Sequence, residues 1–230
     1  MTDGWNWETF NDAFPFVVKG IGMTLGLTIG CYIFALLFGF FWLFIRRVPI
    51  RPISWLFTWI MEFIRSTPPI VQLFFLYYGW HTVPYVGAQL PSFTCAVIAL
   101  GLHFSTYISE VYRSGIDNVD KGQWEAARAL NFPTRMKWTK IILPQALPPM
   151  IPMLGNYLII LFKEVPLAAT IGVVGIMHLA QDYGDQYWNY LEPLTIVALL
   201  FLVLSSLSSL LISWLERRMN FKFEKKKAIA

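Results

Sequence analysis

The sequence predicts an all-α membrane protein of one domain, with five transmembrane helices. Of its 230 residues, 56% are hydrophobic and only 14% are charged, whereas soluble globular chains have roughly 25% charged residues. The mean hydropathy is +0.52, so there are too few charges to cover a water-facing surface of this length. The charges are also clustered, which leaves long apolar segments between them. These observations exclude a disordered chain, an ordinary cytosolic enzyme and a nucleic-acid-binding protein.

The N-terminal segment, residues 1–19, is predicted to lie at or outside the membrane surface. It contains Trp5, Trp7 and Phe10, and aromatic side chains favour the membrane–water interface. A five-span domain, residues 20–215, follows this segment, and a basic tail occupies residues 216–230.

Five segments have the length and composition of membrane spans, since a crossing helix needs about 20 mostly apolar residues. They are Gly20–Ile45, Trp55–Trp80, Ser92–Tyr112, Leu147–Leu179 and Leu194–Leu215. Glycines recur every fourth residue in the first span, from Gly22 to Gly30, which favours close helix packing. Prolines interrupt the second and fourth spans.

The basic residues predict the orientation. Fifteen of the 18 Lys and Arg residues lie in three segments: between spans one and two, between spans three and four, and in the tail. The other two loops, residues 80–91 and 180–193, have none. Because basic residues are retained on the cytoplasmic side, five spans place the N-terminus outside and the C-terminus inside.

The loop between spans three and four, about residues 115–145, is longer than the roughly 2–8 residues that join packed helices. Its centre predicts a short helix from Lys121 to Leu130 that ends at Asn131, with Glu125 and Arg128 as an i,i+3 pair. A second helix is predicted to run through Trp138 and to end at Pro144. The short helix either docks into a groove of a soluble partner or is a solvated linker.

Polar residues inside the predicted spans are candidates for a solute path. A charged group at the bilayer centre costs about 2.5–3.5 kcal/mol and therefore faces the bundle interior or a wet cavity. A zwitterionic solute needs both a cationic and an anionic contact, although residues spaced i,i+3, such as Glu62 and Arg65, also suit a local helix pair. The candidates are Glu62, Arg65, Gln72, Asn156, Lys163, Glu164 and Thr170.

Several motifs resemble those of a known family. Glu125-Ala126-Ala127, with Ile141, Leu143 and Pro144 downstream, resembles the EAA loop of bacterial ABC importer permeases. The run from Phe63 to Gly79 resembles the polar amino-acid branch of that family. The stretches most similar to ectoine and hydroxyectoine permeases are Asn131-Phe132-Pro133, Gly155-Asn156-Tyr157 and Tyr190-Leu191-Glu192-Pro193. Three departures are Asn131 and Ser66, where glycine is usual, and Val165-Pro166, where two hydroxyl residues are usual.

The resemblance implies the MetI-like transmembrane domain of a type I ABC importer in the bacterial inner membrane. It implies two ATPase subunits inside, a second permease that is identical or related, an extracytoplasmic solute-binding protein, and a polar amino acid or ectoine as solute. Residues carried over as coupling to the ATPase are Gly122, Glu125, Ala126, Ala127, Arg128, Leu130 and Asn131.

No catalytic residue, metal site or cofactor is predicted for this chain. It has no Gly-x-x-x-x-Gly-Lys-[Ser/Thr] phosphate loop, so ATP and Mg²⁺ are expected on the ATPase partner. An ion-coupled secondary transporter or channel subunit is the alternative, although such proteins often carry internal repeats with matching broken helices, and the sequence shows no convincing repeat. A membrane scaffold without a path would not need intramembrane charges.

Overall fold

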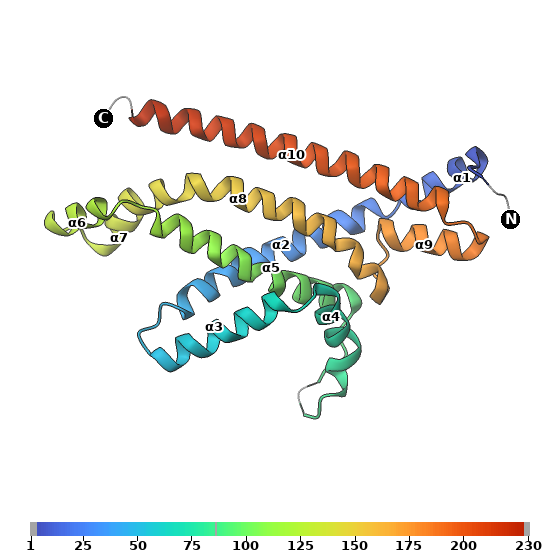
Figure 1. The fold of residues 1–230 in the computed structure, drawn as a ribbon, viewed down its shortest axis with the longest axis horizontal. Helices are drawn as coiled ribbons and strands as arrows, with labels where there is room; N and C mark the ends of the chain where they lie inside the picture. Colours follow the sequence, from blue (N-terminus) through green and yellow to red (C-terminus); the bar gives the residue numbers. More distant parts are fainter. Residues whose placement is uncertain (1–3, 86, 228–230) are drawn as a thin grey trace.

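The computed structural model describes residues 4–85 and 87–227. Of the side chains after Trp214, it describes only that of Arg217. Helices α2, α5, α8 and α10 run along the long axis of an elongated molecule (Figure 1). The helices α6 and α7 and the C-terminus lie at one end, while α1, α9 and the N-terminus lie at the other. The principal helices are α1 (Trp7–Val18), α2 (Ile21–Ile45), α3 (Arg51–Ser66), α4 (Pro69–Phe74), α5 (Ser92–Asp117), α6 (Lys121–Ala129), α7 (Thr134–Met136), α8 (Leu143–Glu164), α9 (Ile176–Tyr187) and α10 (Leu191–Lys227).

Short segments of other helix types continue several of these helices. Two are π-helices, in which each turn is widened, and two are 3-10 helices, in which it is tightened. The π-helices are η1 (Phe75–Gly79) and η3 (Lys137–Ile142), and the 3-10 helices are η2 (Trp80–Thr82) and η4 (Val165–Ile171).

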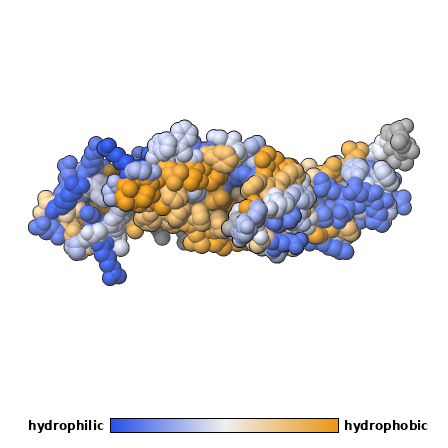
Figure 2. Space-filling model, turned by 90° about the horizontal axis from the view of Figure 1, so that it is seen from below, coloured by the Kyte–Doolittle hydropathy of each residue, from blue (hydrophilic) through white to orange (hydrophobic). Residues whose placement is uncertain are grey.

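Among the described residues, four helical stretches are long and apolar enough to cross a membrane: Ile21–Ile45, Ser92–Asp117, Thr134–Ile171 and Leu191–Trp214. Figure 2 shows the apolar side chains as a band around the middle of the molecule, between hydrophilic ends. Many large apolar side chains of the long helices are exposed, among them Ile29, Leu37 and Leu202, as expected for a surface in contact with lipid or another subunit. The prediction of an all-helical membrane protein is confirmed, with four candidate spans among the described residues.

The second predicted span, Trp55–Trp80, is not one continuous helix. Helix α3 ends at Ser66, and Thr67 is extended, with φ −97° and ψ 139°. The ring of Pro68 disfavours helical geometry at the preceding residue, so the chain bends before α4 begins at Pro69. In Figure 1, α4 points away from the long axis that α3 follows. The count of five spans and the N-out, C-in orientation stay predictions.

The fourth predicted span, Leu147–Leu179, also has different boundaries. Its helical stretch begins at Thr134 and ends at Ile171, where Gly172 adopts a left-handed conformation with φ 81°. A left-handed glycine is the usual end of a helix. Much of residues 180–193, predicted as a loop, belongs to the separate helix α9. The predicted stop at Pro144 is wrong, because the helix continues through it.

Three buried clusters of described residues hold the helices together. The largest joins α2, α5 and α8, and α5 supplies more of its buried residues than any other helix. The second joins α1, α9 and α10 through side chains such as Val17, Ile176 and Ile196, and the smallest joins α2 to α3. At the junction of the first two clusters a Cβ on Gly20 would lie 2.4 Å from the backbone N of Ile176, so only glycine permits this approach. Of the predicted glycine stripe, a Cβ on Gly22 or Gly26 would meet nothing within 4 Å, whereas a Cβ on Gly30 would lie 3.3 Å from Val97 Cγ2, so among the described residues close packing of the stripe is present at Gly30 alone.

Candidate functional site

Helix α6 lies at the end of the molecule opposite the N-terminus (Figure 1). It begins at the cap residue Asp120, whose side-chain oxygen accepts a hydrogen bond from the Gly122 N–H at 2.7 Å, satisfying one of the free donors of the first turn. It ends at Asn131, which has φ 52°, and the Phe132 N–H then donates to the Ala127 carbonyl at 3.0 Å. The predicted helix and its left-handed end are confirmed.

The outer surface of α6 is not covered by the other residues that the structure describes. Glu125, Ala126 and Arg128 are exposed, and Leu130 has 69% of its surface exposed, whereas Ala127 is buried against the protein. The predicted pair of Glu125 with Arg128 is wrong, since neither residue takes part in an ion pair of the described side chains. Both charges are therefore available to a partner.

Tryptophan contacts fix the position of α6 on the helix that follows it. The ring of Trp124 meets that of Trp138 edge to face, with 5.3 Å between the centroids, in a preferred aromatic geometry. The Lys137 Nζ lies 5.9 Å from the centroid of Trp124. Gln145 Nε2 also donates to Gln123 Oε1 at 3.3 Å. A displacement of α6 must therefore displace the base of the Thr134–Ile171 helix.

The break between α3 and α4 is the second candidate region. Gln72, the first polar residue of α4, donates from Nε2 to the Ile64 carbonyl at 2.6 Å and to Thr67 Oγ1 at 2.7 Å. Its Nε2 also lies 3.2 Å from His103 Nδ1 on α5. These contacts satisfy carbonyls that the interrupted helix leaves free, as a helix break inside a membrane requires.

Arg65 lies next to this break, at the end of α3. Its guanidinium lies over the Tyr107 ring, 5.3 Å from the centroid, and Nη2 donates to the Thr106 carbonyl at 3.4 Å. Its Nη1 lies 3.3 Å from Glu62 Oε1, so the i,i+3 pair is present. The Arg65 Nε is buried and has no hydrogen-bond partner, which leaves one cationic donor unsatisfied beside an aromatic wall.

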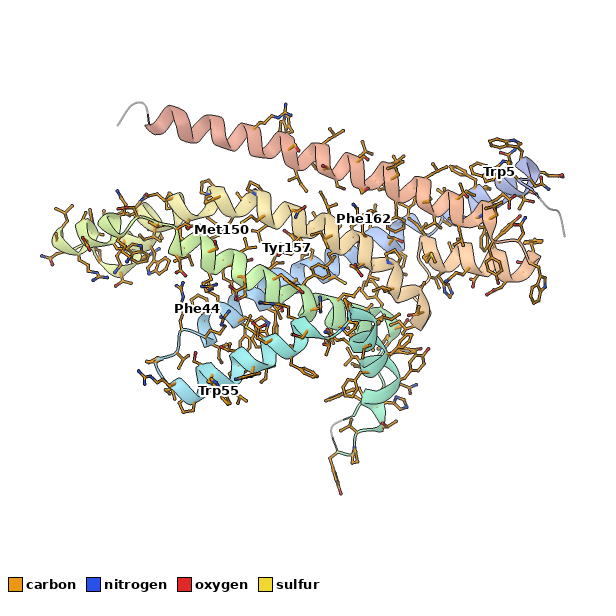
Figure 3. All side chains as sticks on the ribbon, viewed as in Figure 1. Trp5, Phe44, Trp55, Met150, Tyr157 and Phe162 are labelled. Atoms are coloured by element: carbon orange, nitrogen blue, oxygen red, sulfur yellow. The ribbon has the colours of Figure 1, made fainter. Side chains whose placement is uncertain are left out.

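An aromatic pair extends this wall to α8. Tyr107 stacks on Tyr157 with 5.8 Å between the ring centroids, and Figure 3 shows Tyr157 between α8 and α5. We call Arg65, Gln72, His103, Tyr107 and Tyr157 the central cluster. It joins α3, α4, α5 and α8 and contains cationic and amide donors beside aromatic faces. Such a set suits the binding and passage of a small polar solute.

Glu110 is the acidic partner of the central cluster. It forms ion pairs with Arg46 at the end of α2, with Arg113 (Oε2 to Nη2, 2.6 Å), and with Arg65 (Oε1 to Nη2, 3.7 Å). The one carboxylate thus connects α2, α3 and α5. Glu110 therefore contacts three guanidinium groups, of which only that of Arg113 is a local neighbour on the same helix.

The predicted site residues did not include His103, Tyr107, Tyr157, Glu110 or Arg46. A signal was present on α5, where His103, Tyr107 and Glu110 have the spacing i, i+4, i+7 that places residues on one helix face. No comparable signal marks Arg46 or Tyr157, which reach the site through helix packing.

The remaining predicted path residues lie along and beyond the end of α8, apart from the contacts of the central cluster. Lys163 is exposed and Glu164 is half-buried, and within the described side chains neither takes part in an ion pair. Asn156 is exposed one residue before Tyr157. The Thr170 carbonyl accepts from the Tyr78 hydroxyl at 3.4 Å, which links η4 to η1.

Comparisons with known proteins show which family the chain resembles. Residues 35–221 match the family described as binding-protein-dependent transport system inner membrane component. The chain is 39% identical to a probable amino-acid ABC transporter permease protein (y4tG) of Sinorhizobium fredii, over 92% of this chain and 94% of that protein. It is 34% identical to the arginine transport system permease protein ArtQ of Bacillus subtilis, over 90% and 93% of the two chains.

Solved structures agree on the fold. A chain in the crystal structure of an amino acid ABC transporter with histidines aligns with a TM-score of 0.85 and 33% identity, covering 94% of this chain and 99% of that one. A chain of the MetNI methionine ABC transporter in an inward-facing conformation aligns with a TM-score of 0.70 at 21% identity, over 89% and 96% of the two chains. The second likeness concerns the fold alone.

Proposed function

This chain belongs to the binding-protein-dependent transport system inner membrane components, and from that premise we propose that it forms the membrane path for a polar amino acid. It is a multi-pass permease subunit of a bacterial inner-membrane ABC transporter and is not itself catalytic. ATP is hydrolysed on a separate subunit, and a solute-binding protein belongs to the system. The secondary-transporter alternative no longer has support, because no relative named above is of that kind.

The central cluster is the observation that carries the proposed path. The Arg65 guanidinium has an unsatisfied buried Nε and lies beside Tyr107 and Tyr157. In the proposed path it meets the solute carboxylate, because a guanidinium pairs with a carboxylate through parallel hydrogen bonds. Glu62, with half of its side chain exposed, and Glu164 accept from the solute ammonium. The proposed path is also lined by Gln72 in the central cluster. Farther along α8 and beyond its end, it is lined by Asn156, Lys163 and Thr170.

The exposed surface of α6 supports a coupling role. Gly122, Glu125, Ala126, Ala127, Arg128, Leu130 and Asn131 form a short helix whose small residues permit close approach and whose charges have no partner within the described residues. We assign this surface to the ATPase. In this arrangement α6 and the C-terminus are cytoplasmic, the N-terminus is outside, and a second permease, the same chain or a related one, completes the pathway with two ATPase subunits.

The solute class is supported by the names of relatives. One is an arginine permease and another, 33% identical, is the L-cystine transport system permease protein TcyB of Bacillus subtilis. A polar amino acid is therefore the first candidate. Ectoine is the second, favoured by the resemblance of the segments that begin at Asn131, Gly155 and Tyr190; none of the relatives named above has ectoine in its name.

The test is ATP-driven uptake of labelled amino acids and ectoine by proteoliposomes that contain the complete complex and its solute-binding protein. Replacement of Arg65 in Arg65→Met is expected to lower the uptake rate by roughly tenfold or more, since a charged hydrogen bond of about 1.5–3 kcal/mol is lost. The matched control is Arg51→Met, at the exposed start of α3. Equal rates for both variants remove Arg65 from the path, and ion-driven uptake by the permease alone contradicts the whole proposal.

The coupling assignment is tested by co-purification. Glu125→Lys is expected to lose the ATPase subunits, whereas Lys140→Glu, an exposed reversal on η3 outside α6, retains them. Normal assembly of Glu125→Lys with full uptake would contradict the assignment of α6.

A further inference from the structure

A hollow of about 1090 Å³ lies at the end of the molecule that carries the N-terminus, between α1 and the end of α9. Figure 1 shows α1 and α9 at this end, opposite α6. The residues that line it include Glu8, Asp12, Gln186, Tyr187 and Trp188. We call this the outer hollow.

The lining of the outer hollow is acidic and aromatic. It includes the exposed carboxylates Glu8 and Asp12, and none of the described residues that form it is Lys or Arg. Trp188 projects from the end of α9 with 89% of its surface exposed. A basic group lies close to one lining ring, since the Lys19 Nζ is 5.9 Å from the centroid of the Phe16 ring.

A third carboxylate lies behind the wall of the outer hollow. Glu192 is completely buried, and its Oε1 accepts from the Asn6 backbone N–H at 2.7 Å. Its Oε2 is buried without a hydrogen-bond partner. The pKa of Tyr183 is raised by burial and by the neighbouring groups of Asp12, Tyr187 and Glu192. The charges of Asp12 and Glu192 therefore act on the same wall of the outer hollow. A buried carboxylate without a cationic partner is costly, and a cation in the hollow would offset that cost.

The size of the outer hollow indicates its occupant. Sites for drug-sized ligands have volumes of about 300–1,000 Å³, so a single amino acid would leave most of this volume empty. Side chains of a protein surface would fill it. Trp and Tyr are enriched among the residues that dominate protein interfaces, and cations are attracted to their faces. The hollow lacks cationic side chains, so a complementary surface supplies Lys or Arg.

We propose that the outer hollow receives basic side chains of the extracytoplasmic solute-binding protein. The inference rests on the proposed function, because it requires the N-terminal end to face outward and a binding protein to be the partner. Trp188 and Tyr187 form the aromatic rim of the docking surface, and Glu8, Asp12 and the buried Glu192 supply its charge.

The test uses the complete complex in nanodiscs, with the solute-binding protein that stimulates ATP hydrolysis by the wild type as the probe. The measured quantity is the concentration of binding protein that gives half-maximal stimulation. Asp12→Lys reverses a lining charge. Gln186→Lys adds a positive charge at a side chain that forms no hydrogen bond or ion pair within the described residues. The matched control is Asp182→Lys, an exposed reversal on α9 whose residue does not line the hollow.

Both lining variants are expected to raise the half-maximal concentration by about tenfold or more, equivalent to 1.4 kcal/mol, with unchanged basal hydrolysis. Asp182→Lys is expected to stay close to the wild type. Added salt should weaken docking of the wild type more than that of Asp12→Lys, because exposed charges at a rim act through screened attraction.

Three results separate the inference from its premise. If Asp12→Lys and Gln186→Lys behave like Asp182→Lys, the docking site is elsewhere and the inference is wrong, while the importer function stands. If labelled arginine binds the complex without the binding protein and Asp12→Lys abolishes that binding, the hollow is a solute site and the inference is again wrong. If no solute-binding protein stimulates the wild type, the proposed function itself fails.

Discussion

Removal of the Glu110 charge tests whether the network at the end of α2, α3 and α5 holds these helices together. In Glu110→Gln, the three guanidinium groups of Arg46, Arg65 and Arg113 lose their shared carboxylate and repel one another. Glu110 has 27% of its side chain exposed, so the free energy that its ion pairs contribute lies between the values for exposed and for buried pairs. Exposed ion pairs are worth about 0.2–1 kcal/mol each, and breaking a buried pair costs about 3–5 kcal/mol.

An intermediate value of about 2 kcal/mol is expected. For chains of 150–250 residues, 1 kcal/mol changes the unfolding midpoint by about 2–4 °C, so the expected decrease is about 4–8 °C. The assay is thermal unfolding of the permease in nanodiscs, followed by tryptophan fluorescence. Asp117→Asn is the matched control, because Asp117 pairs with Arg47 at 2.9 Å but is 53% exposed, and its loss should cost less than about 1 kcal/mol.

A double-mutant cycle separates the Arg46–Glu110 pair from the rest of the network. With Arg46→Met, the coupling energy should fall in the range of about 0.5–3 kcal/mol found for residues in one network. The reasoning is refuted if Glu110→Gln lowers the midpoint no more than Asp117→Asn does, or if the effects of the two substitutions simply add.

Three further outcomes follow from backbone geometry and packing. Asn131→Gly is expected to stabilise the end of α6 or leave it unchanged, since φ is 52° there and glycine has no steric penalty in that region; Asn131→Val should destabilise it by about 1–2 kcal/mol and weaken ATPase co-purification. Gly20→Ala is expected to lower the unfolding midpoint, because its Cβ would lie 2.4 Å from the Ile176 N and overpacking costs about 1–3 kcal/mol. The control is Gly22→Ala, which should show no decrease, because a Cβ on Gly22 would lie in open space. Trp124→Ala is expected to leave the ATPase bound while uptake per ATP hydrolysed falls, because the contact with the base of the long helix is lost; unchanged coupling would contradict that role, and uptake and hydrolysis are measured in the same proteoliposomes.

Local features could be predicted from the sequence because their causes are local. The short helix at Lys121–Ala129 depends on good helix formers and on a residue that tolerates left-handed geometry, and both are visible within ten positions. Spans are visible because hydropathy is a property of a continuous segment. The interruption of Trp55–Trp80 was predicted from its prolines and is confirmed, because Pro68 disfavours helical geometry at Thr67.

The stop predicted at Pro144 failed for a different reason. A proline inside an α-helix clashes with the carbonyl four residues earlier, here that of Lys140. The π-helix Lys137–Ile142 immediately precedes it, and its widened i→i+5 turn accommodates the proline ring without ending the helix. The ion-pair network around Glu110 was missed because Arg46, Arg65 and Glu110 are far apart in sequence and are brought together only by the packing of α2, α3 and α5.

The continuous helix that replaces the predicted stop connects the two candidate regions. It extends over 38 residues, Thr134–Ile171, or about 55 Å at roughly 1.5 Å per residue, which exceeds the approximately 30 Å of the hydrocarbon core. Trp138 at its base contacts α6, and Tyr157 farther along contacts the central cluster. Between them, prolines at 148, 149 and 152 remove backbone hydrogen bonds, so bending is concentrated in that stretch. We therefore expect a displacement of α6 to change the angle of the helix beyond these prolines, and with it the stack of Tyr157 on Tyr107; the uptake per ATP hydrolysed by Trp124→Ala tests this coupling.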